Sequence, residues 1–234
     1  SNSMNQKSID EGKIFFINYK NHLAKLYIND PNEYIQKKIC TTRSFYEEEM
    51  LDDVAHRVPE GKIFVDVGAN IGNHTVFFTK VCNAKTVYSF EPQKDVYEIM
   101  MKNLEVNYIA DKVNAFNMAL GKERYKAKVI VNNLSNLGMS TVEKSSAGDI
   151  DVDSLDNVLL HKIERVDVIK IDVEGMGMEV LVGAEKIIQK YKPLIYIEVE
   201  TQMSFERVSQ YLAKFGYKPE KRFNYTPTYL FIAK

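Results

Sequence analysis

Residues 63–72 read IFVDVGANIG, and they determine how the rest of the chain is interpreted. An apolar, β-branched run ends with Asp66 and Val67, and the chain then turns through Gly68 and Gly72 into the mostly apolar segment 73–78. This pattern predicts a buried strand, a tight loop and the start of a helix. The backbone N–H groups of such a loop face a ligand at the carboxyl end of the strand.

The spacing of the glycines indicates which ligand. A dinucleotide fingerprint requires G-x-G-x-x-G, whereas Asn70 and Asn73 stand where the second and third glycines belong. A phosphate-binding P-loop is excluded because no lysine follows Gly72. The next predicted strand, residues 86–90, is followed by Glu91, whose carboxylate could accept hydrogen bonds from a ribose. These features favour S-adenosylmethionine (SAM), which has a ribose but no phosphate.

Composition sets outer bounds. The chain has 234 residues, 45% of them hydrophobic, which is enough for one large α/β domain or for one domain with a small appendage. A net charge of -1 predicts no general attraction to nucleic acid or to an anionic membrane. Cys40 and Cys82 lack metal-site spacing, and no apolar run suits a membrane span or signal peptide, so we expect a cytoplasmic protein. Residues 1–3, before Met4, are interpreted as the remnant of a cleaved tag.

Strand and helix patterns alternate from residue 61 onward, which predicts a doubly wound, mostly parallel α/β sheet. Residues 1–60 are predicted to form an N-terminal cap, a hairpin plus a helix, over a main domain of residues 61–234. The expected strands are 13–19, 23–28, 63–67, 86–90, 113–118, 166–171, 194–199 and 229–233, and the expected helices are 45–58, 93–107, 154–161, 178–191 and 204–215. A small hairpin is expected within 121–150, and residues 136–141 are interpreted as a loop that closes over the site.

Acidic residues follow the predicted parallel strands one after another. They are Asp66, Glu91, Asp172 with Glu174, and Glu198 with Glu200. The carboxyl ends of parallel strands meet at the ligand-binding edge of an open sheet, so these acids indicate a site there. Lys170, in a strand predicted to be buried, needs a charged partner, and Asp172 lies two residues further on the same side.

Four motifs give the chain a resemblance to a known family. They are DVGANIG (66–72), FEP (90–92), NMALG (117–121) and KIDVEG (170–175), the last followed by Val180, Leu181, Gly183 and Ala184. In order and spacing they resemble the FkbM-type SAM-dependent methyltransferases, over about residues 63–200. The KIDVEG block is the specific part, because the glycine loop is generic to class I methyltransferases. One departure is Gly177, which stands where the family commonly has a second acid.

The resemblance implies a Rossmann-like class I methyltransferase sheet of seven strands with the last strand antiparallel. It implies SAM contacts from the Gly68–Gly72 loop with Asp66 and Asn70, a ribose contact from Glu91, and an adenine-side wall from Asn117 to Ala119. It also implies methyl transfer to a hydroxyl of a sugar, glycan or natural product.

Methyl transfer to an alcohol requires alignment of the oxygen and removal of its proton. We hypothesise that Asp172 is the base, with Glu174 and Lys170 orienting the acceptor. Asp172, Glu174 and Glu198 could also supply oxygen ligands to Mg²⁺.

Two other readings stay open: an NAD(P)-dependent oxidoreductase, which the missing glycines disfavour, and a SAM-binding protein that has lost catalysis. The identity of the acceptor and the oligomeric state do not follow from the sequence.

Overall fold

The structure, a computed structural model, describes residues 14–131 and 140–234. Most of the predicted closing loop, residues 136–139, lies outside this described part. The main sheet has seven strands. In spatial order they are β12 (Tyr217–Phe223), β13 (Thr228–Ala233), β11 (Leu194–Glu198), β10 (Val168–Ile171), β3 (Ile63–Val67), β4 (Thr86–Phe90) and β5 (Val113–Phe116). β13 is the one strand of this sheet that runs in the opposite direction to the other six, so the predicted seven-stranded, mostly parallel architecture with an antiparallel last strand is confirmed.

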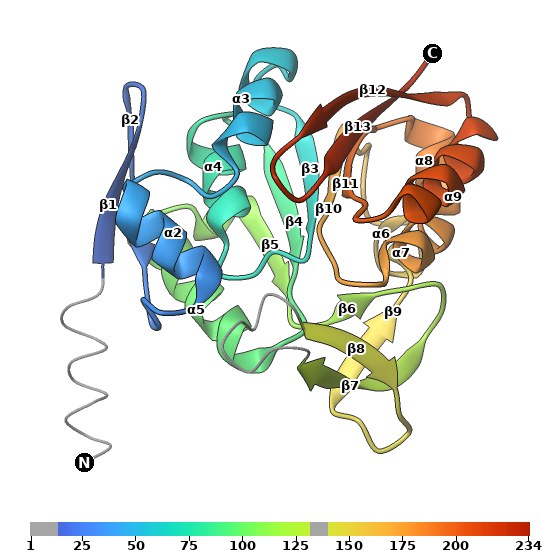
Figure 1. Ribbon diagram of the computed structural model, residues 1–234, viewed down its shortest axis with the longest axis horizontal. Helices are drawn as coiled ribbons and strands as arrows, with labels where there is room; N and C mark the ends of the chain where they lie inside the picture. The colour runs from blue at the N-terminus through green and yellow to red at the C-terminus, as the bar shows by residue number, and fades with distance from the viewer. Residues whose placement is uncertain (1–13, 132–139) are drawn as a thin grey trace.

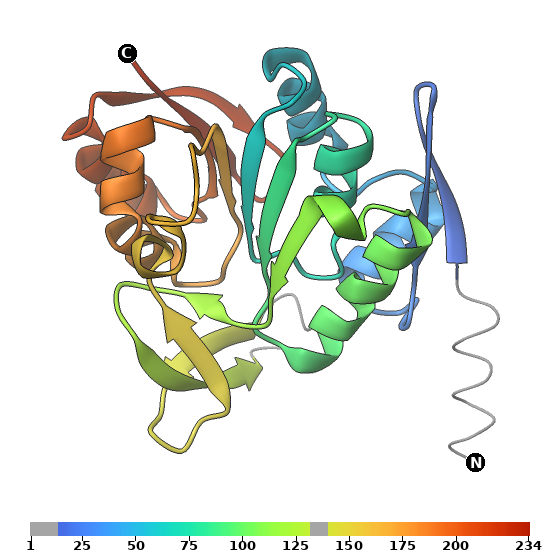
Figure 2. The same cartoon turned by 180° about the vertical axis from the view of Figure 1, so that it is seen from behind.

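Helices cover both faces of this sheet, which makes three layers (Figures 1 and 2). Successive strand residues point to opposite faces, and Phe64 and Val65 accordingly belong to different hydrophobic cores. The core around Phe64 includes residues of α3 (Glu48–Arg57), α4 (Asn73–Lys80) and α5 (Lys94–Val106). The core around Val65 includes residues of α6 (Leu155–Leu159), α7 (Gly177–Gly183), α8 (Glu185–Tyr191) and α9 (Gln202–Ala213).

The first described residues extend the core around Phe64. The hairpin of β1 (Ile14–Tyr19) and β2 (His22–Tyr27) is followed by α2 (Tyr34–Thr42). Side chains of the hairpin such as Ile17 and Leu26 are fully buried in the same core as α4 and α5. Asn107 fixes the position of β2, because its side chain accepts from the Lys25 N–H and donates to the Lys25 carbonyl, at 3.0 and 2.7 Å.

A second, four-stranded sheet lies beside the carboxyl edge of the main sheet (Figure 1). Its strands are β6 (Ala119–Leu120), β9 (Ile150–Asp153), β7 (Tyr125–Val131) and β8 (Ser140–Lys144). β7 and β8 form the hairpin that the sequence predicted within 121–150. The short 3₁₀ turn η1 (Ala110–Lys112) leads into β5. No helix of residues 14–131 and 140–234 has the length and apolarity to cross a bilayer.

Several elements differ from the sequence prediction: strands β6 and β9 of the second sheet were not predicted, and three further differences have a clear physical reason. Helix α2 was not predicted, because Gln36 and Ile39 are its only buried side chains and its start depends on Glu33 accepting from the Ile35 and Gln36 N–H groups. Strand β12 was not predicted, because it is an edge strand whose central residues are exposed. The single helix predicted for 178–191 is two helices, and a Cβ on Gly183, at the end of the first, would lie 2.0 Å from the Gly121 carbonyl oxygen.

Candidate active site

The glycine loop lies at the carboxyl ends of β3, β4 and β10. Gly68 and Ala69 donate their N–H groups to the Phe90 carbonyl at 3.0 and 2.9 Å, which ties the loop to the end of β4. Gly68 has φ +79, and a Cβ there would lie 2.0 Å from the Asp172 carbonyl oxygen. Only glycine therefore allows the loop to approach the end of β10 so closely. Gly72, with φ +91, is the N-cap of α4.

A pocket opens beside this loop. It is lined both by residues predicted to bind the cofactor and by residues predicted to act on the acceptor. Six of the predicted site residues line it together: Gly68, Asn70, Glu91, Ala119, Asp172 and Glu174. Phe90, Met118 and Leu120 supply apolar surface. The pocket thus brings together, at one edge of the sheet, residues that are far apart in the sequence.

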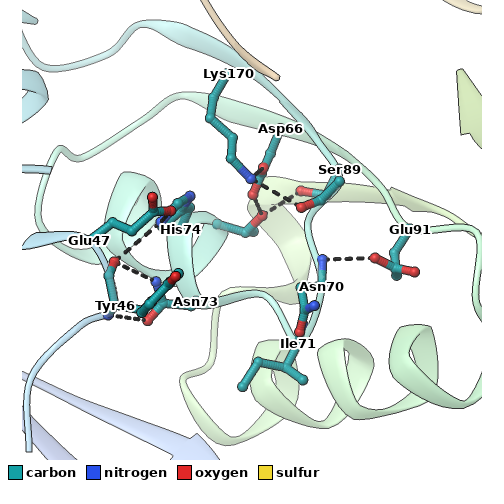
Figure 3. Close-up of polar contacts among 12 residues, drawn as sticks. Tyr46, Glu47, Asp66, Asn70, Ile71, Asn73, His74, Ser89, Glu91 and Lys170 are labelled. Carbon is teal, nitrogen blue, oxygen red and sulfur yellow. Dashed lines mark hydrogen bonds and ion pairs between the residues drawn. The ribbon is translucent and has the colours of Figure 1, made fainter. Parts of the chain in front are cut away.

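Glu91 is held in one orientation by the backbone. Its Oε1 accepts from the Asn70 N–H at 2.9 Å (Figure 3). Its Oε2 accepts from the Gln93 N–H at 2.8 Å. Burial raises the pKa of Glu91 to about 7, although these two hydrogen bonds act in the opposite direction. Each carboxylate oxygen keeps a further lone pair, so both can still accept from the hydroxyls of a ribose.

Asn117 is not among the residues that line the pocket. Its Nδ2 donates to the carbonyl oxygens of Glu91 and Pro92, at 2.9 and 3.1 Å. The side chain therefore fixes the corner after β4, and its neighbours Met118 and Ala119 form the wall of the pocket.

Asp66 and Lys170 lie beneath the loop, outside the lining of the pocket. The Lys170 Nζ donates to Asp66 Oδ1 at 2.9 Å and to the Gly68 carbonyl at 3.0 Å, and the two side chains are 4% and 0% exposed. Asp66 Oδ2 accepts from the Thr75 hydroxyl at 2.6 Å. The sequence paired Lys170 with Asp172, and this was wrong: β10 and β3 are in a register that places Lys170 opposite Asp66.

Carboxyl groups gather at the carboxyl ends of β10 and β11. Burial and the charge of Asp172 raise the pKa of Glu198 to about 12, so Glu198 is protonated at neutral pH. Burial opposes ionisation of Asp172, yet the hydrogen bond with Glu198 and the charge of Lys170 hold its pKa below the usual range. Burial and the neighbouring Glu200 raise the pKa of Glu174 to about 7. At neutral pH Asp172 is therefore ionised, whereas Glu198 is protonated.

Among the described residues, Glu174, Glu198 and Glu200 each have a carboxylate oxygen within 4.8 Å of the others. This trio differs from the predicted metal set, which contained Asp172 in place of Glu200. Carboxylate oxygens are the donors that Mg²⁺ prefers.

The sequence missed a contribution from the segment before α3. Asn73, in the first turn of α4, accepts from the Tyr46 N–H and donates to the Tyr46 carbonyl, both at 3.1 Å (Figure 3). His74 Nε2 lies 3.2 Å from the same carbonyl and 3.5 Å from Glu47 Oε1. Burial and the charge of Lys170 lower the pKa of His74 to about 4, so the ring is neutral. No sequence signal marked Glu47, which reads as one of three acids at a helix start.

Three features together define the class I methyltransferase fold. They are a strand order with one antiparallel strand near the edge, a glycine loop at the carboxyl edge after β3, and an acid after β4. A family model described as the Methyltransferase FkbM domain matches residues 66–219, and the chain belongs to this family.

Known proteins agree with this assignment. The chain is 30% identical over 105 residues to Methyltransferase 1 of Beauveria bassiana (strain ARSEF 2860), a match that covers 45% of this chain and 37% of that protein. The solved FkbM methyltransferase from Methylobacillus flagellatus KT shares 18% identity and a TM-score of 0.57, over 75% of this chain and 44% of that one. The chain thus spans less than half of either relative.

Two further solved structures share the fold. The precorrin-6y C5,15-methyltransferase from Geobacter metallireducens GS-15 is 13% identical with a TM-score of 0.52, over 80% of this chain and 86% of that one. A Streptococcus mutans protein solved in complex with S-adenosylhomocysteine (SAH) is 15% identical with a TM-score of 0.50, over 79% of this chain and 94% of that one.

Proposed function

We propose that the protein is a SAM-dependent O-methyltransferase whose acceptor is a hydroxyl of a sugar, glycan or natural product. The observation that carries the proposal is the shared pocket: Asp172, an ionised carboxylate, lines the same pocket as Gly68 and Glu91. A bound methyl donor and the base Asp172 would therefore share one pocket. Family membership and the SAH-bound structural neighbour support SAM as the donor.

The residues present fit SAM. The glycine loop offers backbone at close range, Glu91 offers oriented acceptors for a ribose, and Phe90, Met118 and Leu120 offer apolar surface for an adenine. When bound, SAM supplies an activated methyl group on a sulfonium. A nicotinamide cofactor fits less well, because its pyrophosphate needs the glycines that Asn70 and Asn73 replace.

The chain's own residues then act on the acceptor. Asp172 accepts a hydrogen bond from the hydroxyl and takes its proton as the oxygen forms its new bond to carbon. Glu174, at the rim of the same pocket, orients the acceptor. Lys170 is a positioning residue. By donating hydrogen bonds to Asp66 and to the Gly68 carbonyl, it keeps the glycine loop and the end of β10 in place.

A divalent cation is a further part of the proposal. Glu174, Glu198 and Glu200 would hold it after Glu198 has lost its proton, and the cation would polarise an acceptor hydroxyl. Turnover that is unchanged in excess EDTA would remove the cation from the proposal and leave the rest intact.

The first test is calorimetric titration of the purified protein with SAH, with NADH as the control. We expect micromolar binding of SAH and none of NADH. Binding of NADH alone would overturn the proposal in favour of an oxidoreductase. Screening of hydroxylated acceptors with methyl-labelled SAM follows, and SAH binding without transfer to any acceptor would favour a non-catalytic SAM-binding protein.

A further inference from the structure

Helix α5 connects the glycine loop with the hairpin of β1 and β2. The helix lies between the main sheet and this hairpin (Figure 2). Among the described residues, β2 pairs with β1 on one edge and with no strand on the other. The hairpin precedes the 66–219 range of the family model, whereas α5 lies within it. Contacts across the second edge of β2 therefore join the family domain to a part of the chain outside it.

Two asparagines of α5 take the place of a third strand along this edge. Asn103 Oδ1 accepts from the Tyr27 N–H at 2.5 Å. Asn107 Oδ1 accepts from the Lys25 N–H at 3.0 Å, and its Nδ2 donates to the Lys25 carbonyl at 2.7 Å. The spacing suits both elements, because four residues of helix rise about 6 Å and two residues of strand about 6.8 Å. Side-chain amides thus hold β2 to one face of α5.

Asn103 differs from Asn107 because it also binds the glycine loop. Its Nδ2 donates to the Ile71 carbonyl at 2.7 Å. Asn103 is 0% exposed, so water cannot take over this bond when the side chain is removed without rearrangement. One turn earlier on α5, Met100 packs against the same loop, since a Cβ on Gly72 would lie 3.0 Å from Met100 Cγ. The loop therefore lies directly on α5.

The bond to Ile71 supports a part of the loop that is conformationally costly. Asn70 has φ +54, in the left-handed region that residues other than glycine rarely adopt. Its Oδ1 accepts from the Ile71 N–H at 2.8 Å. Its own N–H donates to Glu91 Oε1 at 2.9 Å (Figure 3). By fixing the Ile71 carbonyl, Asn103 stabilises the loop conformation in which Asn70 orients Glu91.

We propose that Asn103 is a positioning residue for SAM, through which β2 holds the glycine loop in its binding conformation. This rests on the proposed function, because SAM is the proposed ligand of the loop. Asn103 does not line the pocket, so it acts on the ligand only through Ile71. Without this bond the loop populates other conformations, and the apparent affinity for SAM falls by the fraction that is lost.

The test makes the same substitution at both asparagines. Asn103→Ala removes the bonds to Tyr27 and Ile71, whereas Asn107→Ala removes two bonds to β2 and none to the loop. Calorimetry should show SAH binding weakened about five- to tenfold in Asn103→Ala, the size of one net hydrogen bond, and changed less than about twofold in Asn107→Ala. Both variants should unfold at lower urea concentrations. Equal changes in SAH affinity, or none in either variant, overturn the proposal.

The pH dependence of SAH binding separates positioning from a general loss of stability. The hydrogen bond from the Asn70 N–H lowers the pKa of Glu91, and the charged groups that act on this carboxyl are Lys170 and Asp66. In Asn103→Ala, the rise of SAH affinity with pH should therefore move above the parent value of about 7. Asn107→Ala should keep the parent profile. An unshifted profile in Asn103→Ala contradicts the route through Asn70.

Hydrogen exchange in the parent protein provides a test that does not depend on the folding of a variant. SAH should slow exchange of the Tyr27 amide more than that of the Lys25 amide, because only Tyr27 is joined to the loop through Asn103. NMR resolves the two amides, and equal slowing of both contradicts the proposal. Absence of SAH binding in the parent protein overturns the proposed function, and this proposal with it.

Discussion

Replacement of Lys170 by methionine should destabilise the protein by several kcal/mol. The Lys170 ammonium lies 2.9 Å from Asp66 Oδ1, and the two side chains are 4% and 0% exposed. At that distance and an effective dielectric constant of about 20, the attraction is about 6 kcal/mol before desolvation is subtracted. Removal of the cation leaves Asp66 buried with the Thr75 hydroxyl as a neutral donor. Breaking a buried pair in this way costs about 3–5 kcal/mol.

Lys85→Met is the matched control. Lys85 and Glu164 form a shorter pair, 2.6 Å, but their side chains are 56% and 54% exposed. Solvent screening limits such a pair to about 0–1 kcal/mol. The same substitution should therefore have very different effects at the two positions.

Urea unfolding followed by circular dichroism measures both variants. The free energy of unfolding should fall with the slope of the transition unchanged. Addition of Asp66→Asn to Lys170→Met should cost less than the sum of the two single changes, with a coupling of up to about 3 kcal/mol. If Lys170→Met costs no more than Lys85→Met, Lys170 does not stabilise the charge of Asp66 and the argument for its positioning role fails.

Three further predictions concern the site. Glu91→Gln should weaken SAH binding about 10- to 100-fold in calorimetry, because charge-assisted hydrogen bonds are lost. In the parent protein, SAH should bind more tightly as the pH rises through the Glu91 pKa of about 7, because the ionised carboxylate is the better acceptor. An SAH affinity that does not change with pH would contradict the ribose contact. Asp172→Asn should abolish methyl transfer while SAH affinity stays within about twofold, and near-normal turnover would remove Asp172 as the base. The folded-state pKa of His74, about 4, is below its ordinary 6.5, so below pH 6.5 the unfolded state binds a proton that the folded state does not. Stability relative to a His74→Asn variant should therefore fall by about 3 kcal/mol between pH 7.5 and 4 in urea titrations, and equal pH profiles would show that the ring is not buried neutral.

The fold and the cofactor side were predictable because their signals are local. A buried strand followed by two glycines predicted the loop, and an acid after the next strand predicted Glu91. Both lie where expected, since the edge of a parallel sheet gathers the ends of its strands. Whether these residues bind SAM stays a prediction until the titration is done.

The rest depends on contacts between distant segments. The partner of Lys170 is set by the register between β10 and β3, which are about a hundred residues apart in the sequence. The hydrophobic pattern of the sequence does not predict this register. Glu47 gains its place from Asn224 and from the anchoring of Tyr46 by Asn73. Each of these residues alone resembles an ordinary loop or helix-end residue.

The anchoring of Tyr46 has a consequence for ligand binding, because it connects the cofactor loop with a distant segment of the chain. Asn73 belongs to the helix that begins at the end of the glycine loop, and it also grips the segment that carries Glu47. Any adjustment of the loop around a nucleoside would be passed through these two hydrogen bonds to the segment that carries Glu47. A ligand that contacts this segment would then be energetically coupled to the nucleoside, and thermodynamic linkage requires each to change the affinity of the other by the same factor, whichever binds first.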